Sequence, residues 1–155
     1  GYIREGKLLV HKAIRRATLG PYQIQAAISL VHCEAPSFDQ TPWAYIDDLY
    51  ALLEVAEPSP VVSLNRAVAL AYAGRHDDAR SRWEQVSGDA RLRDYAPFHL
   101  ASAEIHYRGG RRKEAEMALA CGIELIRHDV ERRYLERKLA GWRAESSPLD
   151  IGGKA

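Results

Sequence analysis

The sequence predicts an all-α fold of about eight antiparallel helices. Apolar residues recur at the spacing of three and four that marks one face of a helix, and strict strand-like alternation is hard to find. Alanine and leucine outnumber β-branched residues in most segments, which favours helix. Glycine and proline interrupt these segments at intervals that suit helices of ordinary length.

Glycine and proline mark the helix ends in the first half of the chain. Gly20-Pro21 separates two helices, because glycine often follows a helix end and proline often opens the next helix. Thr41-Pro42 and Ser59-Pro60 each fit an N-cap followed by a first-turn proline. Gly74 ends the last helix of this half. The expected helices span residues 3–18, 22–34, 43–56 and 61–73, with a loop at 36–40.

The second half continues the pattern. The expected helices span residues 76–86, 95–108, 112–127 and 130–142, with a polar connection at 88–93. Gly109-Gly110 stops the second of these helices. We expect residues 1–145 to form one domain and residues 146–155 to form a flexible tail.

One pattern of small and apolar residues occurs twice in the chain. The two copies are 36 residues apart, which is the separation of residues 67 and 103. The matched pairs are Ala67 with Ala103, Gly74 with Gly110, Ala79 with Ala115, and Trp83 with Leu119. In each copy alanines would let two helices approach, glycine would turn the chain, and the large residue would fill the gap to the next pair. This is the pattern of the tetratricopeptide repeat (TPR), whose period is about 34 residues. It predicts a TPR-like right-handed helical solenoid, with residues 22–56 as a degenerate pair.

Composition excludes several classes of protein. The 155 residues are 46% hydrophobic and 28% charged, unlike a disordered or membrane chain. The 22 basic and 21 acidic residues give a net charge of +1, with no general attraction to nucleic acid or anionic lipid. No apolar run approaches the roughly 20 residues of a membrane span, and no signal peptide is visible. The two cysteines make no disulfide framework, so a cytoplasmic location is expected.

The residues give no sign of catalysis, of a cofactor or of a metal. No histidine or cysteine pair has the spacing of a zinc site, and no glycine-rich phosphate loop occurs. Asp47-Asp48 and Asp77-Asp78 are expected in early helical turns, where the helix dipole favours carboxylates. His99 and His106 lie seven residues apart and suit a half-buried helix face, although a small hydrolase using either one is an alternative. We therefore expect a protein that is not an enzyme.

The concave side of the predicted solenoid is a candidate surface for holding a peptide, although it lacks the full lysine and asparagine set of a C-terminal-peptide binder. The opening helix of each TPR pair lines the concave side of a solenoid, and five polar residues fall on such helices. Asn65 either binds a partner there or forms a buried hydrogen bond to a neighbouring backbone group. Tyr50, Trp43 and Trp83 are expected in the core. The candidate surface residues are Tyr22, Gln23, Gln25, Asn65 and Arg66.

A second candidate surface lies on the last expected helix. Arg132, Arg133, Tyr134 and Arg137 gather positive charge around one aromatic ring. The pair Arg132 and Glu136 has the i,i+4 spacing of an ordinary solvated helix face. The patch is therefore either a solvated face or a docking surface.

Five stretches occur in a specific order: residues 2–6, 20–28 (Gly-Pro-Tyr-Gln-Ile-Gln-Ala-Ala-Ile), 43–50, 58–68 and 131–137. Together they resemble the long TPR-like C-terminal extension of one group of extracytoplasmic-function (ECF) sigma factors, which direct bacterial RNA polymerase to promoters. The resemblance runs from about residue 2 to residue 139.

The resemblance implies a regulatory role in transcription initiation. Its partners would be the promoter-binding domains of the same polypeptide, RNA polymerase, or both, with Arg132, Arg133 and Tyr134 as docking residues. No stretch of this chain is similar to a helix-turn-helix promoter reader. DNA contact is therefore expected only through domains of the parent that are absent here, and no membrane partner is expected. The alternative is a stand-alone TPR adaptor.

Overall fold

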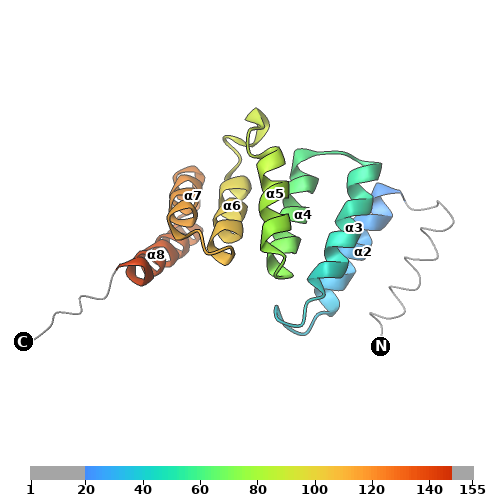
Figure 1. Cartoon of the computed structure of the whole chain (residues 1–155), viewed down its shortest axis with the longest axis horizontal. Helices are drawn as coiled ribbons and strands as arrows, with labels where there is room; N and C mark the ends of the chain where they lie inside the picture. Colours follow the sequence, from blue (N-terminus) through green and yellow to red (C-terminus); the bar gives the residue numbers. More distant parts are fainter. Residues whose placement is uncertain (1–19, 148–155) are drawn as a thin grey trace, which may run out of the picture. The chain divides into compact units, whose positions relative to one another are not determined.

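The computed structural model describes residues 20–147, in which seven α-helices and one short 3₁₀ helix form and no strand occurs (Figure 1). The predicted all-α class is confirmed. The expected helix at 3–18 and most of the expected tail, residues 148–155, lie outside the described residues. The contacts divide the chain between Asp89 and Ala90 into two compact units, each described by itself. The single domain over 1–145 stays a prediction.

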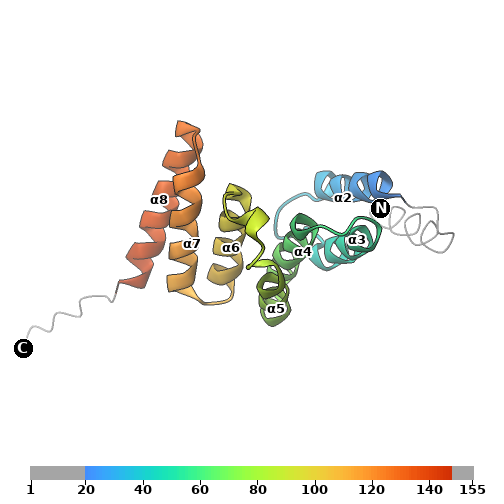
Figure 2. The ribbon, with the colours of Figure 1, turned by 90° about the horizontal axis from the view of Figure 1, so that it is seen from above.

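The first unit contains α2 (Pro21–Glu34), α3 (Trp43–Ala56), α4 (Pro60–Tyr72) and α5 (His76–Val86). Each helix packs on the next one along the chain, and Figure 2 shows α2, α3 and α4 together. Apolar residues of α2, α3 and α4 make one buried cluster, which includes Ile28, Ile46 and Leu53. The expected boundaries are correct to within one residue, because local proline and glycine preferences set them.

Two capping predictions have different outcomes. The Ser59 hydroxyl accepts a hydrogen bond from the Val62 amide at 3.2 Å, so Ser59 is the N-cap of α4 as predicted. Thr41 does not cap α3, because Pro42 occupies the N-cap position. The Thr41 hydroxyl instead donates to the Ser37 carbonyl at 2.8 Å and so closes the loop before the helix.

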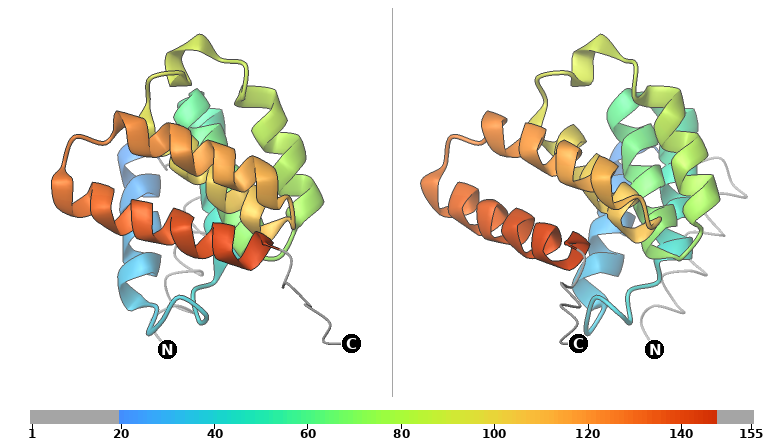
Figure 3. Two further views of the ribbon diagram at one scale, coloured as in Figure 1. Left: turned by 90° about the vertical axis from the view of Figure 1, so that its left-hand side faces the viewer. Right: turned by 60° about the vertical axis from the view of Figure 1, so that its left-hand side comes forward.

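The second unit contains a 3₁₀ helix (η1, Ala90–Leu92), α6 (Ala96–Arg108), α7 (Arg112–Leu125) and α8 (Asp129–Ser146). Figure 3 shows α7 and α8 side by side, and their buried side chains belong to one cluster with residues of α6. The prediction of a polar connection at 88–93 is wrong in part, because residues 90–92 form η1 and Leu92 is buried. The last helix was expected to end near residue 142 but continues to Ser146, since the isolated Gly141 is tolerated inside the helix and no proline follows it before that point.

The α4–α5 and α6–α7 hairpins turn in the same way. Gly74 and Gly110 have φ of 81° and 80°, and the next residue in each case donates its amide to a carbonyl five residues earlier, at 2.9 Å. This is the Schellman ending of a helix, which places glycine in the left-handed region. The alanines at 67, 79, 103 and 115 are at most 1% exposed in both hairpins. The copies differ at their large residue, because Leu119 is buried and Trp83 is half-buried.

Replacing Gly74 by alanine is expected to lower the free energy of unfolding by about 1–2 kcal/mol, the cost of the left-handed backbone for an L-residue. Apart from Gly74 and its two chain neighbours, no described atom lies within 4 Å of a Cβ placed there, so the cost comes from the backbone alone. Asparagine, which tolerates this conformation better, should cost less. Urea unfolding of both variants measures the difference. An alanine variant as stable as the wild type would contradict the assigned turn.

Candidate functional site

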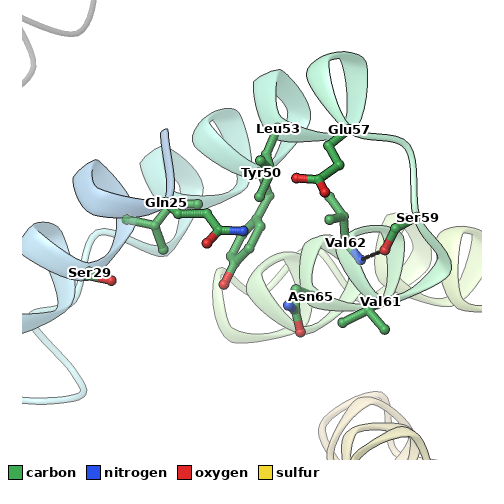
Figure 4. Close-up of a pocket in the computed structure, with 10 residues that line it drawn as sticks. Gln25, Ser29, Tyr50, Leu53, Glu57, Ser59, Val61, Val62 and Asn65 are labelled. Atoms are coloured by element: carbon green, nitrogen blue, oxygen red, sulfur yellow. Dashed lines mark hydrogen bonds between the residues drawn. The ribbon is translucent and has the colours of Figure 1, made fainter. Parts of the chain in front are cut away.

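A groove of about 390 Å³ opens in the first unit, between side chains of α2, α3, α4 and the α3–α4 connection (Figure 4). Its apolar part consists of Ile28, Leu53, Val61 and Val62, of which all but Val61 are buried. The polar groups that line it are Gln25, Ser29, Tyr50, Glu57, Ser59 and Asn65. The groove therefore combines an apolar base with polar side chains at its sides, as ligand sites commonly do.

Most of these polar groups have no partner within the described residues. Among residues 20–147, only Ser59 of this polar set has a partner, the Val62 amide that it caps. The amides of Gln25 and Asn65, the Tyr50 hydroxyl and the Glu57 carboxylate form no hydrogen bond or ion pair with any of residues 20–147. Figure 4 shows Tyr50 extending from α3 into the space between Gln25 and Asn65. The groove thus offers unused donors and acceptors to a ligand.

The Tyr50 phenol is a neutral donor at physiological pH. Burial raises its pKa above the ordinary value of 10.0, because a buried site disfavours the phenolate. Tyr50 was expected in the core, and its ring does pack against the buried cluster. Tyr50 also lines the groove, so its ring packs against the core while its hydroxyl is available to a ligand.

The raised pKa predicts how stability depends on pH. With a folded pKa above the unfolded one, the Tyr50 contribution is fully present below pH 10 and is lost as pH rises through the folded pKa. A Tyr50→Phe variant has no phenol proton to lose. We expect it to lose less stability than the wild type between about pH 8 and about pH 11. Urea midpoints at the two pH values test this, and equal losses in both proteins would contradict it.

The structure brings together two of the residues proposed for the concave surface. Gln25 from α2 and Asn65 from α4 both line the groove. Asn65 is half-buried and forms no hydrogen bond to a backbone group of residues 20–147, so the described residues do not show the structural hydrogen bond considered for it. Tyr22, which is 86% exposed, and Gln23 lie on α2 outside the groove lining.

Sequence reasoning missed Glu57 in this site. The residue follows α3 directly, and its carboxylate reaches the groove only because the connection turns back into α4. The chain direction at that point depends on tertiary packing, so a pattern of residue types could not place it. The one available signal was the adjacent turn-forming sequence Pro58-Ser59-Pro60.

Arg66 lies in an ion-pair network beside the groove and not among its lining residues. Its guanidinium contacts Asp47 at 3.0 Å and Glu54 at 3.6 Å. Glu54 also accepts from Arg82 at 3.1 Å and from the Ser63 hydroxyl at 2.9 Å. The network links α3, α4 and α5. Asp47 is 4% exposed, so Arg66 neutralises a buried carboxylate.

This network also corrects the expectation for the paired aspartates. Asp77 and Asp78 lie in the first turn of α5, as predicted. The first turn of α3 contains no acidic residue. The ion pair with Arg66 therefore stabilises the Asp47 carboxylate. The helix dipole contributes little, because it acts mainly within the first turn.

The basic patch lies on α8 in the second unit. Leu135, Leu139 and Trp142 form the buried side of this helix. Arg132 pairs with Glu136 at 3.2 Å, as the solvated-face interpretation expects. Tyr134 is 60% exposed. An open hollow of about 480 Å³ is lined by Arg133, Glu136, Arg137 and Ala140.

The histidines considered for catalysis do not line the groove. His99 Nε2 donates to the Arg93 carbonyl at 2.7 Å. His106 is buried, and its Nδ1 accepts from Arg111 Nε at 3.1 Å. Within residues 20–147 no three histidine, cysteine, aspartate or glutamate side chains are placed to share a metal ion. In the same range no helix is both long and apolar enough to cross a bilayer.

Comparison with known proteins finds a longer relative. The chain is 38% identical over 147 residues to an uncharacterized protein of Rhizobium meliloti (strain 1021). The similarity covers 95% of this chain and 34% of the relative, so the chain spans about a third of that protein's length. No family model matches the chain, and no solved structure matches it.

Proposed function

We propose that this chain is a protein-interaction segment, the TPR-like C-terminal extension of an ECF sigma factor. In this role it controls sigma activity in the cytoplasm through contacts with the promoter-binding domains of its own polypeptide or with RNA polymerase. The segment binds and does no bond chemistry. DNA contact belongs to the other domains of the parent.

The observation that carries the proposal is the pair of equivalent hairpins. Gly74 and Gly110, which are 36 residues apart, have the same φ to within a degree. The same pair of hydrogen bonds closes the turn at each glycine. Buried alanines at matched positions line the inside of each hairpin. Repetition at this period is typical of TPR-like solenoids, which present surfaces to partner proteins. The ordered motifs at 2–6, 20–28, 43–50, 58–68 and 131–137 support the sigma-factor assignment.

Two surfaces suit this function. The α2–α4 groove carries polar groups with no partner among residues 20–147. The α8 patch combines the exposed ring of Tyr134 with Arg133 and Arg137, and tyrosine and arginine are favoured at protein interfaces. Similarity to one part of a longer protein agrees with a segment that works beside other domains.

Reading the coding sequence upstream of Gly1 tests the assignment. We expect it to encode sigma-type promoter-binding domains. A parent without them would contradict the sigma-factor role and would favour the stand-alone TPR adaptor, which the groove supports equally well.

A further inference from the structure

We propose that the α2–α4 groove binds an extended peptide segment and holds a lysine or arginine side chain of that segment against Glu57. This rests on the proposed protein-interaction function and names its ligand.

The charge of the groove selects the ligand. Glu57 is the one charged residue among the ten that line it, and its carboxylate has no ion pair with any residue of 20–147. The lining offers no cation to a carboxylate or phosphate, and Glu57 would repel an anionic ligand. A basic side chain would give Glu57 the counter-ion that the described chain does not supply.

The unpaired polar groups of the groove favour an extended conformation. A helix already pairs its backbone N–H and C=O groups internally, so its main chain could not pair with the amides of Gln25 and Asn65. An extended segment leaves its backbone groups free, and it directs one side chain at the apolar base and the next away from it.

The neutral polar groups suit a peptide backbone. Gln25 and Asn65 each carry an amide that donates and accepts, which matches the N–H and C=O of one peptide unit. Tyr50 adds a hydroxyl donor between them (Figure 4). These groups recognise a main chain whatever its sequence, so Glu57 is the specificity-determining residue.

Defined peptides test this. The probes are acetyl-Gly-Ser-Val-Ala-X-Ala-Val-Ser-Gly-amide peptides in which X is lysine, arginine, glutamine or glutamate, titrated into the whole chain and followed by two-dimensional NMR. We expect the lysine and arginine peptides to bind about three- to tenfold tighter than the glutamate peptide, as for a partly exposed ion pair. They should shift the side-chain amide resonances of Gln25 and Asn65. The preference should weaken as salt is raised.

Variants test whether the preference for lysine and arginine peptides depends on the Glu57 carboxylate. Glu57→Gln should abolish it, and Glu57→Lys should reverse it in favour of the glutamate peptide. Asp39→Asn is the matched control, because Asp39 is an exposed carboxylate of the same unit outside the groove. It should leave the preference unchanged. The NMR spectrum of each variant shows whether it has folded.

Three results would overturn the proposal: no binding or no charge preference in the wild type, a preference that survives Glu57→Gln, or shifts confined to residues outside the groove. Each would leave the proposed regulatory function standing, since that function is tested separately by transcription with and without this segment. Conversely, unchanged transcription would contradict the regulatory function without affecting the conclusion drawn from peptide binding.

Discussion

Replacing Arg66 by alanine is expected to lower the free energy of unfolding by about 2–4 kcal/mol. The substitution leaves the Asp47 carboxylate, 4% exposed, without its partner at 3.0 Å. It also removes a contact to Glu54. A buried charge without a partner destabilises more than the intact pair stabilises, because its desolvation is no longer offset. Urea unfolding followed by circular dichroism measures the loss.

Two comparisons separate this mechanism from a general effect of losing an arginine. Arg80→Ala removes an exposed pair with Glu84 and should cost less than about 0.5 kcal/mol. The double variant Asp47→Leu/Arg66→Met removes both partners and should recover part of the stability lost in Arg66→Ala. If Arg66→Ala lowers the free energy of unfolding no more than Arg80→Ala does, the network does not stabilise the unit.

Replacing Ala115 by leucine is expected to lower the free energy of unfolding by about 3 kcal/mol. Ala115 is fully buried and packs in one cluster with Ala103 and Leu119. The extra methyl groups have no space unless α6 and α7 move apart. The same measurement by urea unfolding detects the change.

Ala144→Leu is the matched control, since Ala144 is exposed on α8 in the same unit. It adds the same atoms to a helix and should change stability by less than about 0.5 kcal/mol. A tolerated leucine at 115 would show that close approach of the two helices does not depend on a small residue there.

The sequence predicts the helices well, because their ends depend on local preferences. The range of α3 is correct at both ends, and the prolines at 21 and 60 open α2 and α4. The turns at Gly74 and Gly110 also follow from the repeat, and the structure shows both glycines in the left-handed region. Each of these features depends on a few neighbouring residues, whose conformational preferences are strong.

The candidate site was predicted only in part, because side chains from distant segments form it. Helical position was enough to propose Gln25 and Asn65. Glu57 depends on the path of the α3–α4 connection, and the pairing of Asp47 with Arg66 joins residues 19 apart on different helices. Position on one helix does not reveal which side chains a second helix brings near, so the sequence did not show that Arg66 pairs with Asp47 and does not line the groove.

We propose that this segment regulates the polypeptide to which it belongs. Run-off transcription from a promoter of the parent tests it directly, using RNA polymerase with the full-length parent or with the parent lacking residues 20–147. We expect the two proteins to give different amounts of promoter-specific transcript when polymerase and parent concentrations are equal. Equal amounts at every concentration would contradict a regulatory role.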